Sequence, residues 1–114
     1  MKFERFEEII AWQKAKILTN AIYKDFNDLK DLSFKDQIRR ASVSIMNNIA
    51  EGFERSSNNE FKHFLFIAKG SNSEVKSMLY LSKDLSYISN ENFEILFNLS
   101  EEISKIISGL IITL

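Results

Sequence analysis

The chain has 114 residues, enough for a single domain over residues 1–114 and too few for a second. Its 15 Lys and Arg residues against 16 Asp and Glu residues leave a formal net charge of -1, so any attraction to nucleic acid must come from a local patch. The absence of cysteine excludes disulfides, thiolate metal sites and a cysteine nucleophile, and it suits a reducing compartment.

The start of the chain leads directly into a first helix. The segment MKFERFEEII is too charged for a secretory signal. Apolar residues then recur at helical spacing, which predicts a helix from about residue 6 to 28. Its expected inward side carries Phe6, Ile9, Ile10, Ala15, Leu18, Ile22, Phe26 and Leu29.

Serines mark the starts of the later helices. Ser33 opens an imperfect capping box that predicts a second helix to about residue 55. Ser57 with Glu60 is a stronger capping box and predicts a third helix to about residue 87, about 45 Å long. Ser89 or Asn90 would cap a fourth helix, whose apolar end IISGLIITL is about half as long as a bilayer span. We therefore expect a cytoplasmic protein without membrane contact.

The four helices predict an all-α fold. Zero prolines and 3 glycines leave few breaks in the helical pattern. Short links force each helix to turn back on the one before it. The expected architecture is an antiparallel up-down-up-down four-helix bundle.

The second and third helices have more apolar surface than one bundle can bury. On the second helix, Val43, Met46 and Ala50 form an apolar strip that points away from the core centre. We therefore expect the protein to form a homo-oligomer. The expected protomer interface consists of Arg40, Val43, Ser44, Met46, Asn47, Ala50, Glu51, Ile67, Gly70 and Glu74.

The polar part of this interface has a second interpretation. Arg40 and Glu51 would then belong to a solvated surface, where helix-spaced charge pairs contribute only a few tenths of a kcal/mol. A monomeric mass at micromolar concentration would favour this second interpretation.

The motifs resemble those of a known family. The run QIRRASVSIMNNIAEG, with WQKA upstream and FKHFLFIAKGSNSE and KDLSYIS downstream, resembles the 23S rRNA-intervening sequence proteins over nearly the whole chain. The resemblance implies an up-down bundle in a ring-like homopentamer, without established enzymatic activity. Related proteins are accessory subunits of diversity-generating retroelements, where they contact a reverse transcriptase and nucleic acid. The chain departs from the family at Met46, where the family has proline, and it lacks the basic charge of the retroelement proteins.

Four lysines recur at seven-residue spacing along the third helix and form a candidate nucleic-acid ridge. The ridge would span about 32 Å and could neutralise phosphates, with an affinity that falls as salt rises. The other interpretation is the solvated edge of a coiled-coil-like helix, where lysine is common. The lysine ridge consists of Lys62, Lys69, Lys76 and Lys83.

Catalytic and metal-binding patterns are sparse. Glu60 and His63 form one E-x-x-H pair, but a carboxylate-bridged di-iron site needs a second pair, and the chain has a single histidine. No cysteine is present and His63 is the one neutral-range base, so we expect no catalytic triad. We therefore expect no enzyme, no cofactor and no metal.

Two functions remain open. The first is a ring-forming accessory or scaffold protein that binds RNA or DNA weakly. The second is an adaptor that binds a protein partner and makes no nucleic-acid contact.

Overall fold

The structure is a computed structural model that describes residues 3–114. These residues form a short 3-10 helix η1 (Phe6–Glu8) and the helices α1 (Ile10–Asp25), α2 (Leu32–Phe53), α3 (Asn58–Asp84) and α4 (Asn90–Ile112), with no strand among them. The predicted all-α fold with four long helices is confirmed. No helix within residues 3–114 is long and apolar enough to cross a bilayer.

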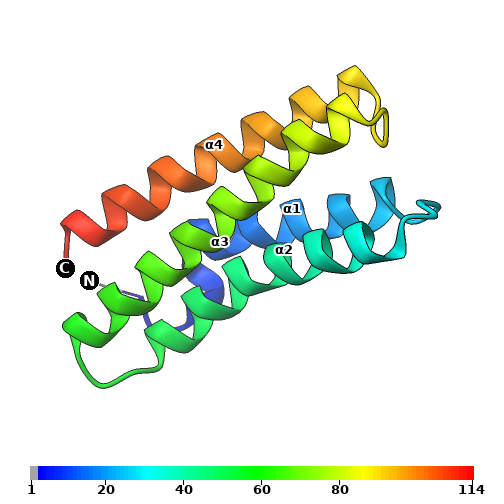
Figure 1. The fold of residues 1–114 in the computed structure, drawn as a ribbon. Coiled ribbons are helices and arrows are strands. Elements are labelled where there is room, and N and C mark those ends of the chain that lie inside the picture. Colours follow the sequence, from blue (N-terminus) through cyan, green and yellow to red (C-terminus); the bar gives the residue numbers. More distant parts are fainter. Residues whose placement is uncertain (1–2) are drawn as a thin grey trace.

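The four helices occupy the corners of an elongated bundle (Figure 1). α1 packs against α2 and α4, and α3 packs against the same two helices, whereas among the described residues the backbones of diagonally opposite helices do not come within 8 Å of each other. The α1–α2 and α3–α4 links lie at one end of the bundle, and the α2–α3 link lies at the other (Figure 1). Each helix therefore has two packed sides and one outward face.

Side-chain caps begin three of the helices. Ser57 caps α3 and Ser89 caps α4, with backbone N–H donors 3.2 and 3.1 Å from the serine oxygens. The predicted cap at Ser33 is wrong, because Asp31 begins α2 and its Oδ1 accepts the N–H of Phe34 at 3.1 Å. An aspartate cap also places negative charge at the positive end of the helix dipole.

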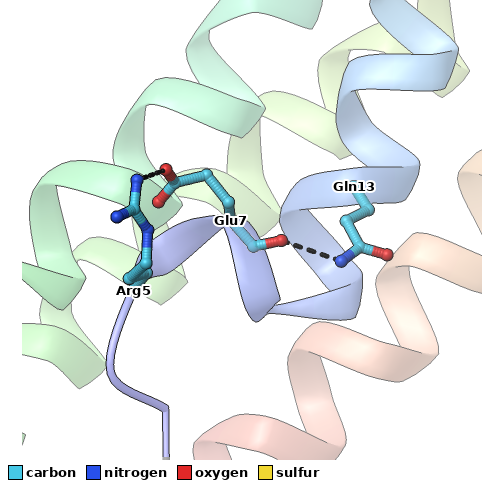
Figure 2. Close-up of polar contacts among 3 residues, drawn as sticks. All are labelled: Arg5, Glu7 and Gln13. Carbon is cyan, nitrogen blue, oxygen red and sulfur yellow. Dashed lines mark hydrogen bonds and ion pairs between the residues drawn. The ribbon is translucent and has the colours of Figure 1, made fainter.

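The first α-helix begins later than predicted, after η1. Figure 2 shows how this turn is held: Gln13 Nε2 donates to the carbonyl oxygen of Glu7 at 2.8 Å, and Arg5 pairs with the Glu7 carboxylate at 2.7 Å. The hydrogen bond from Arg5 keeps the pKa of Glu7 below its usual value. Ile9 fills the core position, so the adjacent Ile10 points outward and is 48% exposed, contrary to the prediction.

The core is built from aliphatic side chains of all four helices. Ile22, Ile45, Leu65 and Leu96 are among the residues that are 0% exposed. Complete burial of such a side chain contributes about 1.5–3 kcal/mol. Since these residues recur at helical spacing, the packed face of each helix is the one that the sequence pattern predicts.

A glycine lets α2 and α3 approach closely. A Cβ atom at Gly52 would lie 2.6 Å from the Cβ of Phe64 and 3.1 Å from the ring of Phe61. Any larger residue would therefore push the two helices apart. α2 runs without interruption through Met46, so the segment has no break where the family has proline.

A polar layer crosses the middle of the apolar core. Asn72 Nδ2 donates to the carbonyl oxygen of Ser100 at 2.9 Å, and Ser100 Oγ donates back to Asn72 Oδ1 at 2.8 Å. Between α1 and α2, the Thr19 hydroxyl is shared between the carbonyl oxygens of Ala15 at 2.8 Å and Ser42 at 3.1 Å. Because an unpaired buried polar group is costly, these pairs favour one axial alignment of the helices.

A hydrogen bond joins the two links at one end of the bundle. The Tyr87 hydroxyl donates to Asp31 Oδ2 at 2.8 Å, and this bond raises the pKa of Tyr87. Ser86 has a positive φ of 58°, a left-handed conformation that reverses the chain after α3. The contact ties the cap of α2 to the entry into α4.

Candidate functional site

Most of the predicted protomer interface lies on α2. Its polar members point outward, and its small and apolar members lie half-buried beside them. Arg40, Asn47 and Glu51 are exposed, whereas Val43, Ser44 and Ala50 are half-buried.

Met46 differs from the rest of this surface. It is half-buried and packs against the core of its own subunit. Methionine is flexible enough to fill an irregular gap between helices. Less of Met46 is therefore available to a second molecule than the sequence pattern suggests.

α3 exposes several apolar side chains on its outward face, among polar ones. Ile67 is 40% exposed, and Phe66 and Leu81, which lie outside the predicted interface, are 54% and 47% exposed. A Cβ atom at Gly70, within the same face, would meet no atom within 4 Å. Nothing in the subunit thus requires glycine at this position, and the space beside it is open to another molecule.

Polar side chains join α2 and α3 along their outer seam. The hydroxyls of Ser44 and Ser71 are 2.8 Å apart, and Asn48 Nδ2 donates to the carbonyl oxygen of Ser44 at 2.8 Å. Gln37 Nε2 donates to the Glu74 carboxylate at 3.2 Å. The structure therefore brings the α2 and α3 parts of the predicted interface onto one continuous surface.

A shallow groove of about 440 Å³ borders this surface and is referred to below as the α2 groove. The Arg39 guanidinium lies 4.4 Å above the Tyr23 ring, and its Nη2 donates to the carbonyl oxygen of Tyr23 at 3.0 Å. Tyr23 belongs to α1 and was not predicted as a site residue, because only the packing of α1 on α2 brings it to the groove. The groove is lined by Tyr23, Arg40, Val43, Ser44, Asn47 and Asn48.

The lysine ridge lies on the side of α3 that faces α4. Lys76 Nζ is 2.6 Å from the Glu101 carboxylate, and this hydrogen bond lowers the pKa of Glu101. Lys83 Nζ lies 4.7 Å from the centre of the Phe93 ring. Half of the ridge is thus engaged with α4, and its other members, Lys62 and Lys69, are half-buried.

The E-x-x-H pair lies at the start of α3. Glu60 and His63 are both exposed, and the His63 ring contacts the ring of Phe64 at 5.7 Å between centroids. Within the described part of the chain, no three His, Asp or Glu side chains gather as metal ligands would. Nothing in this geometry adds the ligands that the pair lacks.

Comparisons with known proteins cover nearly all of this fold. The sequence model of the 23S rRNA-intervening sequence protein family matches residues 7–109. The chain is also similar to a crystal structure from Bacteroides thetaiotaomicron, described as a protein with unknown function from the S23 ribosomal protein family. The two share 30% sequence identity with a TM-score of 0.83, and the match covers 89% of this chain and 97% of that chain. No curated protein matches the chain.

Proposed function

Because the chain belongs to the 23S rRNA-intervening sequence protein family, we propose that it is a non-enzymatic accessory or scaffold protein that works as a ring of its own copies. Each subunit is an antiparallel up-down-up-down bundle, and the outward faces of α2 and α3 contact a neighbouring subunit. The homopentamer is the assembly that the family resemblance implies. The observation that carries the proposal is the set of exposed apolar side chains on the outward face of α3.

The exposure of these apolar side chains supports self-association. Phe66, Ile67 and Leu81 leave between 40% and 54% of their surface in water. Complete burial of a large apolar side chain contributes about 1.5–3 kcal/mol, so covering the exposed half contributes about 1 kcal/mol each. An apolar patch with a polar rim is typical of protein–protein contacts.

Light scattering of the purified chain tests the proposal. At micromolar concentration, the mass should be a multiple of the 13.3 kDa of one chain. Ile67→Lys should lower it, since a charged side chain cannot be buried in an apolar contact without a large desolvation cost. Ile17→Lys is the matched control, because Ile17 is 56% exposed on α1, away from the proposed contact. A wild-type mass of one chain would refute self-association.

Weak RNA or DNA binding through the lysine ridge is a second candidate function. Lys62 and Lys69 form no ion pair within residues 3–114, whereas Lys76 is neutralised by Glu101. A ring would repeat Lys62 and Lys69 in every subunit and so raise the local charge density.

A salt titration with labelled RNA and DNA separates this function from the adaptor function. Binding through the ridge should weaken as salt rises and should fall in the double variant Lys62→Glu and Lys69→Glu. The absence of binding even at low salt would favour an adaptor with a protein partner.

A further inference from the structure

The α2 groove carries positive charge that its own subunit leaves without a carboxylate partner. Arg40, which lines the groove, forms no ion pair within residues 3–114, although Asp36 lies one turn before it. Val43 gives the groove an apolar wall between Arg40 and Asn47. The groove is therefore suited to an acidic partner that also presents an apolar side chain.

The first half of α4 presents such a surface, which we call the α4 acidic edge. Glu91, Glu94, Ile95 and Asn98 are all exposed, and Ile95 is 56% exposed. Their spacing places them on one side of the helix. Neither Glu91 nor Glu94 forms an ion pair in the described part of the chain, whereas both glutamates in the second half of α4 pair with lysines of neighbouring helices.

The groove and the acidic edge lie at similar heights along the bundle. The buried polar layer, which includes Ser42 and Ser100, marks the middle of the helices. The helix rises 1.5 Å per residue, so along the helix axis Arg40 is about 3 Å from Ser42 and Glu94 is about 9 Å from Ser100. Both are displaced toward the end that carries the α1–α2 and α3–α4 links (Figure 1). Arginine and glutamate side chains can span the remaining difference.

We propose that the α2 groove of one copy receives the α4 acidic edge of the next copy. Glu94 pairs with Arg40 across this contact, and Ile95 packs against Val43. The proposal rests on the self-association proposed above and names the second surface that a ring requires. Because groove and edge are different surfaces, the contact is head-to-tail, and their similar height favours a closed ring over a helical filament.

The chemistry of both surfaces favours a second copy over a nucleic acid in the groove. Phosphates would pair with Arg40 but would leave Val43 and Ile95 uncovered. A second copy provides partners for Arg40, the glutamates of the α4 acidic edge and the exposed isoleucine together. Complementary charge of this kind sets the specificity of a contact.

Charge reversal tests the proposed contact in the full chain. Arg40→Glu and Glu94→Arg should each raise the concentration needed for assembly by about tenfold or more, because each places like charges opposite one another. The double variant, and a mixture of the two single variants, should recover the wild-type mass. Lys105→Glu is the matched control for Arg40→Glu, since it makes the same charge change in the second half of α4. Circular dichroism checks that every variant keeps its helices.

The outcomes distinguish this contact from self-association in general. If the wild-type chain is monomeric, both proposals fail. If it assembles but the two charge reversals change its mass no more than Lys105→Glu does, the groove-to-edge contact is wrong and self-association through another surface stands. If both reversals disrupt assembly and the double variant fails to recover it, Arg40 and Glu94 are not partners. Recovery of assembly in the double variant supports the contact.

Discussion

Asn72 and Ser100 form a buried pair whose removal should reveal how the bundle holds its alignment. Asn72 is 1% exposed and Ser100 is 0% exposed, and the two residues share two hydrogen bonds between α3 and α4. Ser100→Ala removes one of these bonds and leaves the buried Asn72 Oδ1 without that donor. Leaving such a group unpaired costs about 1–3 kcal/mol, so we expect the free energy of unfolding to fall by about 2 kcal/mol.

The double variant should behave differently from the single one. Asn72→Leu combined with Ser100→Ala removes both polar partners and fills most of the space with apolar atoms. Replacing both members of a buried polar pair is often nearly neutral. We therefore expect the double variant to be within about 1 kcal/mol of wild type in unfolding free energy, with a coupling between the two sites of about 1–2 kcal/mol.

Equilibrium unfolding in urea measures these differences. The protein concentration must be the same for every variant, because assembly adds a concentration-dependent contribution to stability. A loss of about 2 kcal/mol corresponds to a decrease in Tm of roughly 8 °C for a domain of this size. The single variant Asn72→Leu completes the comparison. If Ser100→Ala is neutral, or if the double variant loses as much stability as Asn72→Leu and Ser100→Ala added together, the two residues do not stabilise the bundle as a pair.

Three further changes test other parts of the bundle. Gly52→Ala should lower the unfolding free energy by about 1–3 kcal/mol in chemical denaturation, because its Cβ would clash, whereas Gly109→Ala, where a Cβ meets nothing, should be neutral or slightly stabilising. Asp31→Ala should cost about 1 kcal/mol in the same assay by removing the cap of α2, and an unchanged stability would contradict that role. Lys76→Gln should flatten the acid part of the stability profile. Lys76 lowers the pKa of Glu101, so the ion pair contributes its full stabilisation above pH 4.5, the usual pKa of a glutamate. This stabilisation is lost as the pH falls through the lowered pKa of Glu101. An unaltered profile below pH 4.5 would contradict it.

Local sequence signals predicted the helices well. Apolar residues at helical spacing marked the packed faces, and Ser57 marked the start of α3 through a bond that depends only on neighbouring residues. The prediction was wrong at Ser33 and at Ile10, where two local solutions competed. At the first site Asp31 caps the helix instead, and at the second η1 shifts the start of α1.

The candidate site was less predictable from the sequence. The outward positions of Arg40 and Gly70 follow from helical periodicity, and the structure places both residues in the open. The contributions of Tyr23 to the α2 groove and of Glu101 to the lysine ridge depend on which helices are neighbours and how they are aligned. A single helix carries no information about that alignment.

The sequence by itself determined the four helices, their packed faces and the excess of apolar surface on α3, because each of these depends on residues within a few turns of one another. Only the tertiary structure decided that half of the lysine ridge is engaged with α4 and that Arg40 in the α2 groove has no ion-pair partner within residues 3–114. Both outcomes depend on side chains far apart in the chain, whose distances are set by the packing of α2 on α1 and of α3 on α4.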